Sequence, residues 1–222
     1  MPSRTVLPMP APDQVRYKSI LKEGFKTFPE RENNYLKYQE AKRGAKVDYL
    51  PIRVDIENVS RCNYHCTMCQ VSDWDHFKRA EDMSISDYKK FMKEQYGLIE
   101  IKIQGMGEPL LSQDFFEMVK FARDRHIWVR STNNGSLLHI KDNYKKLIDS
   151  DINEAIISID GATDKTYETI RRGGKFKMVT RNCKMLNKYA VQNTDVRVRM
   201  WSVVQKENFH ELEKFPALAG EL

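Results

Sequence analysis

From residue 51 onward, hydrophobic and polar positions follow two recurring patterns. Every second residue is apolar in short stretches, for example at Ile52, Val54 and Ile56, which predicts strands. In longer stretches apolar residues such as Phe115 and Val119 recur at helical spacing, which predicts helices. The predicted strands are 52–56, 99–103, 127–131, 155–159 and 196–204, and the predicted helices are about 84–97, 114–122, 142–149 and 176–189, with another from about 209.

This alternation of strands and helices predicts an α/β fold with a parallel sheet and outer helices. Such a sheet either stays open as a doubly wound layer or curls into a barrel. In both cases the active site lies at the carboxyl ends of the strands. A complete barrel needs more strands than this chain offers, so we expect a partial barrel or a piece of a longer protein.

Residues 1–50 are expected to form an N-terminal extension that is only partly helical, and residues 51–222 the main domain. Residues 1–12 are rich in proline and indicate a loose arm. Helices are predicted at 13–28, with Asp13 as a possible N-cap, and at 34–42. No motif occurs in the extension.

Charge and hydropathy limit the expected partners. The chain has 37 basic and 31 acidic residues, and the two signs are interspersed, which indicates a solvated surface and makes a nucleic-acid partner unlikely. Apolar stretches are far shorter than a membrane span and no leader pattern opens the chain, so we expect a cytoplasmic protein without membrane contact. Thiols stay reduced there, which favours metal ligation over disulfides for the cysteines.

Three of the four cysteines, Cys62, Cys66 and Cys69, follow the first predicted strand with the spacing C-x3-C-x2-C. Three thiolates hold three irons of a [4Fe–4S] cubane and leave the fourth iron open for chemistry. The alternative is a structural zinc site, which needs four nitrogen or sulfur ligands; His65 lies inside the loop. Cys183 lies on an apolar helix face and is expected in the core.

Each of the other unusual loops also follows a predicted strand. They are Gly-Met-Gly-Glu-Pro at 105–109, Thr-Asn-Asn-Gly at 132–135 and Ser-Ile-Asp-Gly at 158–161. Because parallel strands end at the same edge, these loops and the cysteine loop should meet in space. Ser158 and Asp160 should leave the fourth strand on the same side, since strand side chains alternate.

These four motifs, in this order, resemble the radical S-adenosylmethionine (SAM) superfamily, and most closely its SPASM-type branch, which also tends to carry a run like residues 170–176. The resemblance covers residues 51–212. It implies a partial (β/α)6-type barrel, and we expect the chain to be truncated at the C-terminus, with the last strand and the C-terminal domain missing.

The resemblance also implies the chemistry. Cys62, Cys66 and Cys69 would ligate a [4Fe–4S] cluster whose open iron binds the amino and carboxylate groups of SAM. An electron from the cluster would cleave SAM to methionine and a 5′-deoxyadenosyl radical, which abstracts hydrogen from an unknown substrate. Partners would be an electron donor such as flavodoxin or ferredoxin, and a peptide, sugar or nucleotide-like substrate. The alternative is a non-catalytic iron–sulfur or SAM-binding fragment, or a structural metal-binding domain.

The resemblance assigns the remaining candidates to SAM. Gly105, Gly107 and Glu108 would hold the amino group, with Pro109 fixing the chain beyond; Met106 stands where glycine is commoner. Further candidates are Ser158 and Asp160 for the ribose or carboxylate, Arg171 or Arg172 for the carboxylate, Asn134 for the methionyl or ribose part, and Val204, Met68 and Tyr64 beside the adenine. The alternative for Asn134 is a residue that merely suits the turn.

Overall fold

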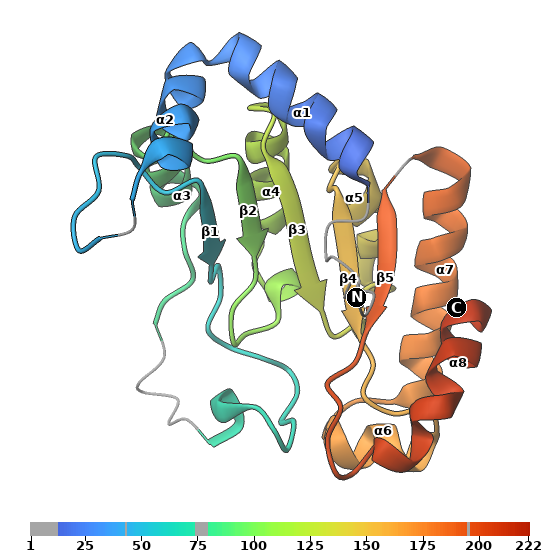
Figure 1. The fold of residues 1–222 in the computed structure, drawn as a ribbon. Coiled ribbons are helices and arrows are strands. Elements are labelled where there is room, and N and C mark those ends of the chain that lie inside the picture. Colours follow the sequence, from blue (N-terminus) through green and yellow to red (C-terminus); the bar gives the residue numbers. More distant parts are fainter. Residues whose placement is uncertain (1–12, 43, 74–79, 195) are drawn as a thin grey trace, which may run out of the picture.

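The computed structural model describes residues 13–42, 44–73, 80–194 and 196–222, so the predicted loose arm lies outside the described residues. Its centre is a single sheet of five parallel strands in sequential order (Figure 1). The strands are β1 (Arg53–Ile56), β2 (Glu100–Ile103), β3 (Trp128–Asn133), β4 (Glu154–Ser158) and β5 (Arg197–Trp201). The predicted α/β fold with a parallel sheet is therefore confirmed.

Four helices connect the strands and pack on one face of the sheet (Figure 1). They are α3 (Ile85–Glu94), α4 (Phe115–Arg123), α5 (Asn143–Asp149) and α7 (Phe176–Asn193). The outward side chains of the strands, such as Ile101, Val129 and Ile157, are buried against helix residues such as Phe115 and Leu186. The hydrophobic core therefore lies between the sheet and these helices, and the other face of the sheet remains for the site.

The segments near β4 and β5 differ from the sequence prediction. The short helix α6 (Asp164–Ile170) was not predicted, although Thr163 caps it by accepting from the backbone N–H of Thr166. Strand β5 ends at Trp201 rather than at residue 204, because the N–H of Val203 donates to Asp160 instead of continuing the ladder. The predicted last helix is a 3₁₀ turn at Phe209–Lys214 followed by α8 (Phe215–Glu221).

The two N-terminal helices, α1 (Gln14–Thr27) and α2 (Pro29–Glu40), lie across the amino ends of the strands (Figure 1). Asp13 caps α1 as predicted, whereas α2 begins earlier than predicted, with Pro29 in its first turn. The buried side chain of Arg31 donates to the carbonyl oxygens of Tyr96 and Arg125. The ring of Tyr17 packs on Trp128. These contacts hold the helices against the end of the sheet opposite the site.

Among the described residues, none of the helices combines the length and the apolar character that crossing a membrane requires.

Candidate active site

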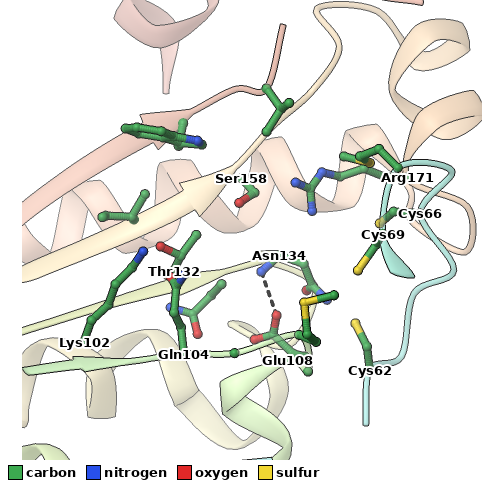
Figure 2. A pocket seen from close by; sticks show the side chains of 18 of the residues that line it. Cys62, Cys66, Cys69, Lys102, Gln104, Glu108, Thr132, Asn134, Ser158 and Arg171 are labelled. Carbon is green, nitrogen blue, oxygen red and sulfur yellow. Dashed lines mark hydrogen bonds between the residues drawn. The ribbon is translucent and has the colours of Figure 1, made fainter. Parts of the chain in front are cut away.

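A cavity of about 710 Å³ opens at the carboxyl edge of the sheet, on the face away from the main helices (Figure 2). This volume lies within the range of small-molecule sites. The loops after β1, β2, β3 and β4 all contribute to it, as expected for a parallel sheet. The predicted residues that line it are Cys62, Cys66, Met68, Cys69, Gly105, Gly107, Glu108, Asn134, Ser158 and Arg171.

The cysteine loop is held by backbone hydrogen bonds to the last residue of α6 and to the segment that follows it. The N–H of His65 donates to the carbonyl of Arg172, and that of Thr67 to the carbonyl of Ile170, both at 2.9 Å. The three cysteine side chains project from this loop toward one end of the cavity (Figure 2). These two hydrogen bonds tie the cysteine loop to the chain around the end of α6.

A single metal ion and a cubane cluster make different demands on the three thiols, because one ion needs its ligands to converge on one point. In the described part of the chain, no three His, Cys, Asp or Glu side chains converge closely enough to hold one ion. A cubane instead gives each thiolate its own iron. Burial raises the pKa of Cys62, and it raises the pKa of Cys66 to about 11, so cluster binding would have to displace these protons. His65 and Cys183 do not line the cavity.

The turn after β2 is held by Glu57, a residue that the sequence motifs did not reveal. Its carboxylate accepts from the backbone N–H of Met106 at 2.6 Å and from that of Gly107 at 3.3 Å. A Cβ at Gly107 would overlap the carbonyl oxygen of Val59, so only glycine lets the turn come this close to the chain after β1. The turn is therefore preorganised at the cavity wall.

Glu108 connects the loops after β2 and β3. It is almost fully buried, and its carboxylate accepts from the N–H of Asn134 at 2.7 Å and more weakly from that of Leu110 at 3.4 Å. The side chain of Asn134 in turn donates to Asn63 in the cysteine loop at 2.9 Å. Burial raises the pKa of Glu108 to about 7, against the hydrogen bonds that favour its charged form.

This raised pKa predicts a pH-dependent stability. The folded protein binds the Glu108 proton more tightly than the unfolded chain does, so the penalty for burying the charge is absent at pH 4 and grows as the pH rises toward 7. Above that pH the penalty is constant, at up to about 3 kcal/mol. The free energy of unfolding of the cofactor-free protein should therefore fall as the pH rises from 4 toward 7. In urea unfolding, Glu108→Gln should make this fall smaller. An unchanged pH dependence in the variant would contradict the assignment.

Arg171 and Asp160 form a buried ion pair beside the cysteines. Both the Nε and one terminal nitrogen of Arg171 lie 2.7 Å from the same carboxylate oxygen of Asp160. The other oxygen accepts from the N–H of Val203 at 2.7 Å. Asp160 is thus fully buried and outside the cavity lining, which corrects the expectation that it faces the cofactor together with Ser158. Its role is to position Arg171, which does line the cavity; Arg172 is exposed on the surface.

Three other candidates also lie outside the lining. Tyr64 is buried, with its ring close to Gly174 under the segment after α6. Pro109 is buried and starts a 3₁₀ turn. Val204 is 56% exposed, and its neighbour Val203 lines the cavity in its place, because the chain leaves the strand after Trp201.

The sequence reading missed a group of polar residues on the inner face of the sheet. Lys102, Gln104, Arg130, Thr132, Arg199 and Trp201 all line the cavity. They occupy every second position of β2, β3 and β5, or the residue just after the strand. Alternation along a strand places such residues on the face opposite the apolar positions, but the sequence analysis gave them no individual role and named only Thr132, as part of the 132–135 motif.

The sequence matches the radical SAM superfamily over residues 57–219. This chain therefore belongs to that superfamily, as its motifs predicted. Members of the superfamily use a [4Fe–4S] cluster and SAM, the two cofactors that the motifs indicated.

The match to curated relatives covers only part of the length of each relative. Mycofactocin maturase MftC of Mycolicibacterium smegmatis is 30% identical over 172 residues, which are 77% of this chain and 42% of that protein. GTP 3′,8-cyclase of Aliarcobacter butzleri is 30% identical over 175 residues, 77% of this chain and 52% of that protein. The chain thus spans about half the length of these relatives.

Solved structures share the fold. Streptococcus suis SuiB bound to S-adenosylmethionine aligns with a TM-score of 0.64 at 16% identity, over 76% of this chain and 38% of SuiB. SuiB bound to its precursor peptide SuiA aligns with a TM-score of 0.63 at 15% identity, over 90% of this chain and 50% of SuiB. At these identities the likeness supports the partial-barrel fold alone.

Proposed function

We propose that this chain is the catalytic core of a radical SAM enzyme. The observation that carries the proposal is that Cys62, Cys66 and Cys69 and the turn at residues 105–108 meet at one cavity, although they come from different loops. When bound, the cluster supplies the electron that cleaves SAM to methionine and a 5′-deoxyadenosyl radical. That chemistry would remove hydrogen from a substrate, which the cavity residues do not identify by name.

In this proposal the residues of the chain bind and orient the cofactors. The three cysteines hold the cluster. Backbone groups of the 105–107 turn and the Glu108 carboxylate would bind the amino group of SAM, and the Arg171 guanidinium, aligned by Asp160, would pair with its carboxylate. Ser158 and Asn134 lie where the ribose or methionyl part would pass, and Met68 offers a soft surface to the adenine.

The proposal also concerns the partners and the compartment. A small redox protein such as flavodoxin or ferredoxin would supply electrons, and the substrate would be a peptide, a sugar or a nucleotide-like molecule. All four cysteines are free thiols, and ligation of a cluster needs reduced thiols. A reducing, cytoplasmic environment is therefore part of the proposal.

Anaerobic reconstitution with iron and sulfide tests the proposal. We expect the absorption and iron content of a four-iron cluster, and formation of 5′-deoxyadenosine when dithionite and SAM are added. A cluster that forms but yields no 5′-deoxyadenosine would support the alternative of a non-catalytic iron–sulfur fragment. Binding of zinc without any cluster would support a structural metal domain.

Glu57 offers a milder test of the SAM site. Glu57→Ala removes the acceptor of two backbone N–H groups, and a lost charge-assisted hydrogen bond of this kind should weaken SAM binding about tenfold. Glu57→Gln keeps one carbonyl oxygen and should lose less. Calorimetry on the reconstituted protein measures both, with Glu94→Ala on the surface of α3 as the matched control. Equal affinities in all four proteins would remove Glu57 from the site.

A further inference from the structure

The inner face of the sheet carries cations that the proposed cofactor site does not use. Lys102 on β2 and Arg130 on β3 are direct partners in the strand register, and Arg199 extends from β5. All three line the same cavity as the cysteines. Figure 2 shows Lys102 at the end of the cavity opposite the three cysteines. The cavity thus has one end suited to the cluster and another end rich in positive charge.

Two buried acids lie behind these cations and fix the arginines. Glu100 accepts from Arg130 at 2.7 Å and pairs with Arg53 at 3.0 Å. Glu154 lies 2.8 Å from Arg199 and accepts from the indole N–H of Trp128. The arginines are therefore held in defined orientations at the floor of the cavity.

Lys102 differs from the two arginines. In the described part of the chain its ammonium makes no hydrogen bond or ion pair. Asp55 and Glu100 attract the ammonium only by longer-range electrostatics, and Glu100 already forms ion pairs with two arginines. The neighbouring Arg130 repels the ammonium, and half-burial together with this repulsion lowers the pKa of Lys102. Two cations placed side by side in a partly buried site repel each other. An anion bound between them attracts both and offsets this repulsion.

We propose that this floor binds an anionic group of the substrate, a carboxylate or a phosphate, with Lys102 as its main contact and Arg130 and Arg199 beside it. Ile156 and the half-exposed indole of Trp201 supply an apolar wall for the rest of the substrate. An anion anchored at Lys102 would leave the body of the substrate extending toward the cysteine end. This inference names the substrate class of the proposed active site and rests on that proposal.

Isothermal calorimetry on the anaerobically reconstituted protein tests the anion site, with pyrophosphate as the phosphate probe and glutarate as the carboxylate probe. We expect at least one of them to bind. Lys102→Met should weaken that binding about tenfold or more, as expected for loss of a charged hydrogen-bond partner. Lys102→Arg keeps the charge and should retain most of the affinity. Lys93→Met, which removes an exposed lysine on α3, is the matched control.

The outcomes separate the possibilities. Tighter binding of pyrophosphate identifies a phosphate group and tighter binding of glutarate a carboxylate; either supports the site. Absence of binding by both probes, equal affinity in Lys102→Met and the unchanged protein, or a loss confined to Arg171→Met would overturn it. Circular dichroism checks that Lys102→Met folds, and Lys102→Gln replaces it if it does not. Because anion binding does not require SAM cleavage, its failure is distinguishable from failure of the proposed enzyme activity.

Discussion

Replacing Cys66 by alanine should reduce 5′-deoxyadenosine formation to the background of the uncatalysed reaction. Two thiolates would remain to hold the cluster, so its assembly should fail or leave a labile centre. The cysteine loop lies outside the core formed by the sheet and the main helices, so the fold should persist. Iron content, visible absorption and product formation after reconstitution measure the effect.

Cys183 provides the matched control for this loss. It is buried on α7 and contributes to the core rather than to the cavity. Cys183→Ala should lower stability modestly, because a small cavity forms, while iron content and product formation stay unchanged. A Cys66→Ala protein that still made 5′-deoxyadenosine, or a Cys183→Ala protein that lost its cluster, would show that the three-cysteine assignment is wrong.

Arg171→Met should have the second large effect, on stability as well as on SAM binding. It leaves the fully buried Asp160 without its cation, and an unpaired buried charge costs about 3–5 kcal/mol. Urea unfolding should show this loss. Calorimetry should show weaker SAM binding, because the cavity loses the guanidinium beside the cysteines.

A double-mutant cycle tests the cause of the instability. Combining Arg171→Met with Asp160→Asn removes both charges and keeps an acceptor for the N–H of Val203, so stability should recover by a large part of the loss. SAM binding should stay weak. The exposed Arg172→Met is the control and should change neither property. If Arg172→Met weakened SAM binding instead, the carboxylate contact would belong to Arg172.

The sequence was sufficient for those parts of the site whose chemistry is local. Cysteine spacing and the Gly-Met-Gly-Glu-Pro turn are complete within a few residues, and the alternation of strands and helices placed them at one edge. The contact between Glu57 and the turn was not readable, because an acid just after a strand is compatible with many partners.

Other differences arose from contacts between distant segments. Ser158 and Asp160 leave β4 two positions apart, which suggested a shared orientation. However, the strand ends at Ser158, and Asp160 turns inward to meet Arg171 and Val203. The hydrogen bond from the N–H of Val203 to Asp160 ends β5 early, and Val203 lines the cavity where Val204 was expected. Pairing between a loop after β4 and one after β5 has no signature in either local sequence.

The two faces of the sheet have separate roles, one in stability and the other in lining the cavity. Residues such as Ile101, Val129 and Ile157, which hold the fold together, all point toward the helices, while Thr132 and its inner-face neighbours contact the cavity. Evolution can therefore replace the residues that face the cavity, and so adapt the site to another substrate, while the residues that face the helices keep the chain folded. A scaffold divided in this way can diversify its reactions without first acquiring extra stability.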